Sequence, residues 1–341
     1  MNVSADIVLP VYQYPTLTIL IDDSASFLDS LEMQLPQNLH IKAFSDSRLA
    51  MAWLRKESRF GGAEKLPIRI AYDDADLSFD QRTIAIDFGQ IYHQVVNPHR
   101  FSVPSVLIVD YAMPQMDGIS FFKAIQDLPC KKVLLTGEAD ESMVIEAFNQ
   151  GLIDRFYKKN DNRSFARLAA EIDQLHRQFF IAQSRTLKDL LIRDCFAFLS
   201  DPEMVILVEQ LCSRFKFIEH YVFPNPAGLL FLDTRGKATL LVVETDASMQ
   251  SHVEVAQASG GPAELLCALN ERQVVPFFAD TGGMYTDAIG AGWLAYCLPA
   301  ETCFGRQRYY WALFDMPSQL LPSPLCSYSE FRSTQKTAPY R

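Results

Sequence analysis

Three carboxylates follow apolar runs of this chain in a pattern that could handle a phosphoryl group. Asp110 comes directly after the apolar residues 106–109, and Asp22 and Asp23 come directly after residues 17–21. Taken alone, Asp110 could be a helix cap or a turn residue. Two adjacent carboxylates, however, repel each other unless a cation lies between them, and hard carboxylate oxygens suit Mg²⁺. The pattern therefore predicts a small metal site that could also neutralise a phosphoryl oxygen.

Two further side chains extend this set. Thr136 follows the short apolar run 132–135, and Lys159 closes the segment 155–159, RFYKK. Singly, each would be an ordinary surface residue. A hydroxyl and an ammonium group beside three carboxylates are nevertheless what an acyl phosphate needs, because each can donate a hydrogen bond to its oxygens.

A parallel sheet would bring these residues together. Buried parallel strands read as continuous apolar runs, and ligands of open α/β sheets lie at the carboxyl ends of the strands. Residues 39–54 continue the pattern as a strand followed by a helix. We expect an α/β fold with a doubly wound, five-stranded parallel sheet, a long insert at about residues 59–104, and a smaller α+β output domain after it.

In these motifs the chain resembles the receiver domain of bacterial two-component response regulators, over about residues 16–180. The resemblance implies a flavodoxin-like fold in which Asp110 is the phosphoacceptor. It also implies that Mg²⁺ is held by Asp22, Asp23, Asp110 and the backbone carbonyl of Ala112.

The same resemblance assigns a switch and its partners. Thr136 matches the switch hydroxyl, Phe156 the switch aromatic and Lys159 the lysine that pairs with the phosphoryl group, with Lys158 as the alternative lysine. A sensor histidine kinase or phosphotransfer protein would be the phosphoryl donor, and phosphorylation would drive homodimerisation. The expected activity is that of a phosphoacceptor with self-dephosphorylation only.

The remaining chain divides into segments of different character. We expect an N-terminal extension at 1–15, a helical connector at 181–198, an α+β output domain at 199–316 that loosely resembles PAS modules, and a flexible tail at 317–341. The insert at 59–104 is either a partner-docking element or a passive surface insertion. The overall layout also resembles quorum-sensing response regulators of the α-hydroxyketone type.

Composition restricts the partners further. The net charge is −10 and the pI is near 5.1, which disfavours a predominantly nucleic-acid-binding protein without excluding a local basic patch. No apolar run is long enough to span a bilayer, so we expect a cytoplasmic protein. The output domain has no known catalytic signature, and the alternatives are that it binds a nucleotide, another small ligand or nucleic acid.

Overall fold

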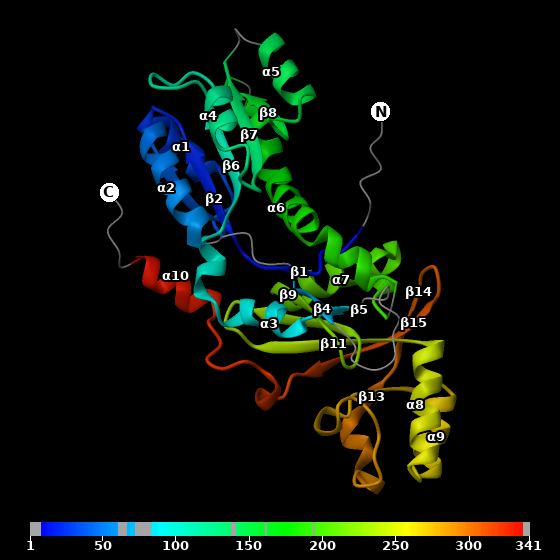
Figure 1. Ribbon diagram of the computed structural model, residues 1–341. Coiled ribbons are helices and arrows are strands. Elements are labelled where there is room, and N and C mark those ends of the chain that lie inside the picture. The colour runs from blue at the N-terminus through cyan, green and yellow to red at the C-terminus, as the bar shows by residue number, and fades with distance from the viewer. Residues whose placement is uncertain are drawn as a thin grey trace. The chain divides into compact units, whose positions relative to one another are not determined.

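The computed structural model describes residues 8–60, 67–71, 83–137, 141–160, 162–193 and 195–336 (Figure 1). The chain forms two compact units. The parallel-sheet unit consists of Tyr14–Lys65 and Pro98–Gln183, and the antiparallel-sheet unit consists of Met1–Gln13, Leu66–Asn97 and Ser184–Arg341. The chain therefore leaves and re-enters each unit, which the linear order of predicted domains did not include.

The parallel-sheet unit contains the predicted five-stranded parallel sheet, in the order β3-β2-β6-β7-β8. Its strands are β2 (Leu17–Ile21), β3 (His40–Phe44), β6 (Pro104–Asp110), β7 (Lys131–Thr136) and β8 (Arg155–Lys158). The central strands are apolar throughout because both faces of the sheet are covered. This confirms the doubly wound, flavodoxin-like fold.

Helices cover the two faces of this sheet. They are α1 (Ala25–Gln34), α2 (Ser47–Phe60), α4 (Gly118–Ala124), α5 (Glu141–Asn149) and α6 (Asn162–Leu191). Alternate residues of a strand point to opposite faces. Accordingly, Ile19 and Val109 pack in a core with residues of α2, α4 and α5, whereas Leu20 and Ile108 pack with residues of α1 and α6.

The antiparallel-sheet unit is built on six strands in the order β1-β9-β10-β11-β15-β14. These strands are β1 (Tyr12–Gln13), β9 (Phe217–Phe223), β10 (Gly228–Asp233), β11 (Ala238–Thr245), β14 (Glu301–Phe304) and β15 (Arg308–Asp315). The sequence predicts the hairpin of β10 and β11, and the structure contains it as an antiparallel pair.

Helices and short elements complete this unit. The helices are α7 (Pro202–Phe215), α8 (Asp246–Ala258), α9 (Ala263–Asn270) and α10 (Tyr328–Lys336). The 3₁₀ helices are η2 (Ala197–Ser200), η3 (Ala279–Thr281), η4 (Gly290–Tyr296) and η5 (Ser318–Leu320). A two-stranded sheet joins β12 (Val274–Pro276) to β13 (Cys297–Pro299). Helix α10 lies in the segment expected to be a flexible tail.

The predicted insert contains two strands and a helix. Strand β4 (Ile68–Ala71) pairs antiparallel with β5 (Thr83–Ile86), and α3 (Phe88–Val96) follows. Asp87 caps α3 by accepting a hydrogen bond from the backbone amide of Gln90, as expected for a helix N-cap. A 3₁₀ helix, η1 (Pro98–Ser102), returns the chain to the parallel-sheet unit. Residues 66–97 of the insert thus belong to the antiparallel-sheet unit, whereas its two ends belong to the parallel-sheet unit.

Candidate functional site

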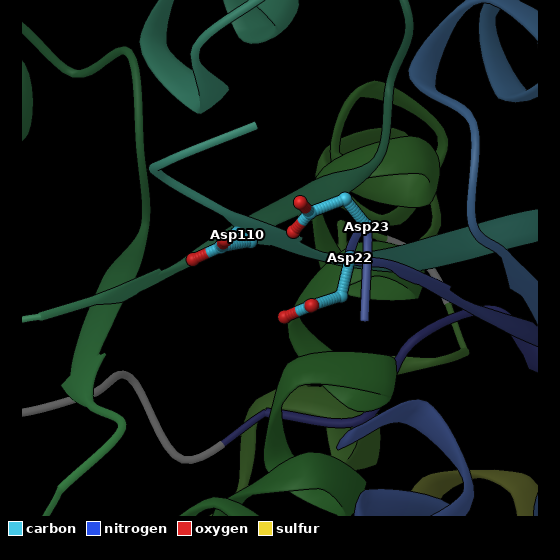
Figure 2. A group of neighbouring side chains, drawn as sticks. All are labelled: Asp22, Asp23 and Asp110. Carbon is cyan, nitrogen blue, oxygen red and sulfur yellow. The ribbon is translucent and has the colours of Figure 1, made fainter. Parts of the chain in front are cut away.

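Three carboxyl groups meet at the carboxyl-terminal edge of the parallel sheet. One carboxylate oxygen each of Asp22, Asp23 and Asp110 lies within 4.8 Å of the others. Figure 2 shows the three side chains converging from the ends of β2 and β6. Asp22 and Asp110 are buried and Asp23 is exposed. The adjacent parallel strands thus bring together residues that lie far apart in the sequence.

The turn after β6 fixes the position of Asp110. The backbone amide of Tyr111 donates to the carbonyl of Leu135 in β7, and the amide of Gly118 donates to the carbonyl of Tyr111. A Cβ atom at Gly118 would lie 2.5 Å from the carbonyl oxygen of Asp110, so only glycine allows helix α4 to start this close to the strand end. The Asp117-Gly118 pair in the sequence is the signal for this close approach.

The turn after β2 fixes the position of Asp22, which Asp23 follows directly in the sequence. Ser24 caps α1 by accepting from the amide of Phe27, and the Ser24 amide donates to Asp22 Oδ1 at 2.9 Å. The amide of Asp22 donates to the carbonyl of Phe44 in β3. Burial raises the pKa of Asp22, although hydrogen bonds from Lys159 and Ser24 oppose this effect.

Lys159 connects the carboxylates of the two strands. Its Nζ lies 2.5 Å from Asp22 Oδ2 and 2.8 Å from Asp110 Oδ1, and it also lies 4.5 Å from the centre of the Phe27 ring. Burial lowers the pKa of Lys159, but hydrogen bonds and charge interactions with Asp110 and Asp22 outweigh it and raise the pKa overall. The contact with Phe27 was not predicted, since nothing in the sequence places that ring beneath the ammonium group.

The remaining predicted site residues lie around this cluster. Thr136 is buried at the end of β7, and its hydroxyl donates to the carbonyl of Gly137. Phe156 of β8 is exposed and packs edge-on against Phe148 of α5, with ring centres 6.2 Å apart. Ala112 lies exposed in the turn after β6. Lys158 is also exposed, whereas Lys159 contacts the acids.

The cluster suits a small divalent cation. Its donors are hard carboxylate oxygens, which Mg²⁺ prefers. Asp22 Oδ2 is buried, and apart from its ion pair with Lys159 it accepts no hydrogen bond of good geometry from the described residues. A buried carboxylate oxygen in this state has capacity left for a metal ion.

Comparison with known proteins finds a family that is similar to part of the chain. The family model described as the response regulator receiver domain matches residues 75–170. This match includes Asp110, Thr136 and Lys159. Asp22 and Asp23 lie outside it, ahead of the insert. Among curated proteins, no similar sequence is found.

Solved structures extend the similarity to the rest of the chain. The structure of the Legionella pneumophila response regulator LqsR is 27% identical, with a TM-score of 0.75 and 95% of each chain covered. An adenylate cyclase structure from Rhodopirellula baltica is 19% identical, with a TM-score of 0.34, covering 53% of this chain and 98% of that one. A signal receiver domain of a putative Luxo repressor protein from Vibrio parahaemolyticus is 14% identical, with a TM-score of 0.33, covering 52% and 97%.

The last two TM-scores are too low to bear on the fold. The similarity to LqsR agrees with the resemblance to response regulators of the α-hydroxyketone (Lqs) type that the layout of the sequence suggests. Residues 75–170 thus match the response regulator receiver domain, and over nearly its whole length the chain is similar to the Legionella response regulator LqsR.

Proposed function

We propose that this protein is a cytoplasmic response regulator that accepts a phosphoryl group on Asp110 from a histidine kinase or a phosphotransfer protein. The observation that supports this most strongly is the meeting of Asp110 with two further acids and Lys159 at one strand edge. No helix among the described residues is both long and apolar enough to cross a membrane.

The chemistry follows from the positions of the side chains. A carboxylate oxygen of Asp110 forms the new bond to phosphorus while the bond to the donor nitrogen breaks, and the donor histidine keeps the electron pair. Lys159 Nζ, already 2.8 Å from Asp110 Oδ1, can donate to an oxygen of the transferred group. Asp22, Asp23, Asp110 and the carbonyl of Ala112 would hold Mg²⁺, whose charge would neutralise the phosphoryl oxygens.

A second part of the proposal concerns the surface made by α5 and β8. Ile145 and Phe148, three residues apart on α5, and Phe156 of β8 are apolar side chains that are 49%, 42% and 38% exposed, and the Phe148 and Phe156 rings are in contact. We call these three residues the α5–β8 patch. Exposed apolar patches mark interaction surfaces. In the proposed switch, the Thr136 hydroxyl turns from the Gly137 carbonyl toward the phosphorylated Asp110, and Phe156 moves inward and reshapes the patch.

Two matched variants test the phosphoacceptor. Asp110→Asn removes the acceptor, whereas Asp117→Asn changes an acid in the same turn that serves only as the N-cap of α4, a role that asparagine also fills. Incubation with acetyl phosphate and Mg²⁺, followed by intact-protein mass spectrometry, should give one added phosphoryl group in the wild type and in Asp117→Asn. Labelling that persists in Asp110→Asn would contradict the assignment.

Light scattering tests the dimerisation step. The wild-type protein with Mg²⁺ and beryllofluoride should shift from monomer toward dimer, and Ile145→Lys should block the shift while leaving acetyl phosphate labelling intact. If the wild type is labelled on Asp110 but its mass in solution does not change, the phosphoacceptor assignment stands and the proposed dimerisation is wrong.

A further inference from the structure

A second candidate site lies in the antiparallel-sheet unit. A cavity of about 230 Å³ is bounded by the turn between β9 and β10, the end of β11, one side of α8 and the loop after η3. Two glycines of that loop, Gly282 and Gly283, have positive φ angles of 68° and 95°, a conformation that other residues rarely adopt. An ideal Cβ on Gly283 would lie 3.5 Å from the nitrogen of Pro226, so the loop closes over the β9–β10 turn.

A buried pair of ionisable side chains forms the polar part of this cavity. Glu244 of β11 and His252 of α8 are 3% and 4% exposed, and His252 Nε2 lies 3.2 Å from Glu244 Oε1. The capping box of Thr245 and Ser248 starts α8 directly after β11, which places His252 two turns into the helix and beside Glu244. Both side chains line the cavity.

Only one ring nitrogen of His252, Nε2, has a hydrogen-bond partner among the described residues. Among the described residues, no group forms a hydrogen bond with the buried Nδ1 atom. An unpaired buried polar atom is unfavourable, and it therefore needs a partner such as a ligand or an ordered water molecule. A purely structural pair that holds α8 against β11 would not need the cavity beside it.

The chemistry of the lining defines the occupant. If Nε2 donates its hydrogen to Glu244, Nδ1 can only accept; if the ring is protonated, Nδ1 donates. A hydroxyl group satisfies either state, since it both donates and accepts. The remaining lining is partly apolar and partly uncharged polar. No lysine or arginine lines the cavity among the described residues. The apolar residues include Pro224, Pro226, Val243 and Met284, and the polar ones include Asn225, Thr245, Ser248 and Ser251.

Size and charge exclude other ligands. Pockets for drug-sized ligands measure about 300–1,000 Å³, and a cavity of about 150 Å³ holds benzene. A phosphorylated ligand would meet the carboxylate of Glu244 with no cationic side chain to balance it. We propose that this cavity binds a small uncharged molecule that carries a hydroxyl group beside an apolar group, with the hydroxyl on His252 Nδ1.

Three related probes test this in the full-length protein. Benzyl alcohol has the required hydroxyl, toluene lacks it, and benzyl phosphate replaces it with an anion. Chemical shifts of ¹³C-labelled methionine methyl groups report binding, with Met284 at the cavity and the exposed Met33 of α1, in the parallel-sheet unit, as the internal control. The His252 ring signals report contact with Nδ1.

The expected result is a saturable shift of Met284 and His252 with benzyl alcohol, at least about tenfold weaker binding of toluene, and none of benzyl phosphate. His252→Phe should reduce benzyl alcohol to the level of toluene, and Met284→Trp, at a half-exposed site, should fill the cavity and abolish both. No saturable shift with benzyl alcohol, tighter binding of benzyl phosphate, or an unchanged preference for the alcohol in a folded His252→Phe variant would overturn the proposal. Phosphorylation of Asp110 is measured separately and does not depend on this outcome.

Discussion

His176 of helix α6 should make the stability of the parallel-sheet unit depend on pH. Its ring is held by three hydroxyl groups: Nδ1 lies 2.9 Å from Thr16 Oγ1 and 2.7 Å from Ser105 Oγ, and Nε2 lies 3.1 Å from Thr18 Oγ1. The three hydroxyl-bearing residues are buried. Burial lowers the pKa of His176 from 6.5 to about 4, because none of these partners carries the negative charge that would stabilise an imidazolium ion.

The direction in which stability changes with pH follows from proton binding. Between pH 6.5 and about 4 the unfolded chain takes up a proton at His176 that the folded unit does not, so the folded unit loses stability as the pH falls. Above pH 6.5 both states are neutral at this ring and the contribution is fully present. A shift of this size corresponds to about 3 kcal/mol, of which about 2 kcal/mol is lost between about pH 7 and about pH 4.5.

Urea denaturation of the wild type and of His176→Gln tests this value. Glutamine can keep hydrogen bonds to the hydroxyl groups but does not titrate. The wild type should lose about 2 kcal/mol more than the variant between about pH 7 and about pH 4.5, and this comparison cancels other groups such as Asp173, whose pKa burial raises. Equal losses in the two proteins, or a His176 ring signal that titrates at its ordinary pKa, would refute the reasoning.

Three other substitutions probe the candidate site and its turn. Lys159→Ala should slow labelling of the acceptor by acetyl phosphate at least about tenfold. The control Lys158→Ala, at an exposed position, should leave the labelling rate within about twofold of the wild-type rate. Equal rates for the two variants would count against the lysine assignment. Ala112→Asn should shorten the lifetime of the phosphorylated protein, because an amide can orient an attacking water and alanine cannot; a wild-type half-life of seconds in a radiolabel chase would remove the basis for this expectation. Gly118→Ala should lower the free energy of unfolding by about 2 kcal/mol, since the new methyl group collides with backbone atoms. The control Gly137→Ala, where a Cβ meets no atom within 4 Å, should change the free energy of unfolding by less than about 0.5 kcal/mol. Similar losses in both variants would contradict the packing argument.

The meeting of these residues at one edge was predictable because its signals are local. Asp22, Asp110 and Thr136 each follow an apolar run, and parallel strands bring such positions to one edge of the sheet. The sequence favours Lys159 over Lys158 only through the resemblance, since that choice places Phe156 at the switch aromatic. In the structure Lys159 carries the ion pairs to Asp22 and Asp110.

The antiparallel-sheet unit was harder to predict because its contacts are distant in sequence. The β10–β11 hairpin is local and was expected, but the position of β15 beside β11 depends on pairing across the helices between them. The apolar residues 293–299, WLAYCLP, predict a strand. In the structure Trp293 instead lies in the 3₁₀ helix η4, and strand β13 starts only at Cys297. Glu244 is the only charged residue of strand β11, and this charge within a buried strand is the sequence signal for the pair with His252.

The segment before the first receiver strand has a role that the sequence does not indicate. Tyr12 and Gln13 of β1 pair with Tyr221 and His220 of β9, and His220 Nε2 lies 3.0 Å from the carbonyl oxygen of Pro10. Without this segment, β9 would become the edge of the sheet and expose unpaired backbone groups. A fragment that starts at residue 199 would lack β1 as well as the insert, so we expect it to aggregate. Ligand binding to the antiparallel-sheet unit therefore has to be measured on the full chain.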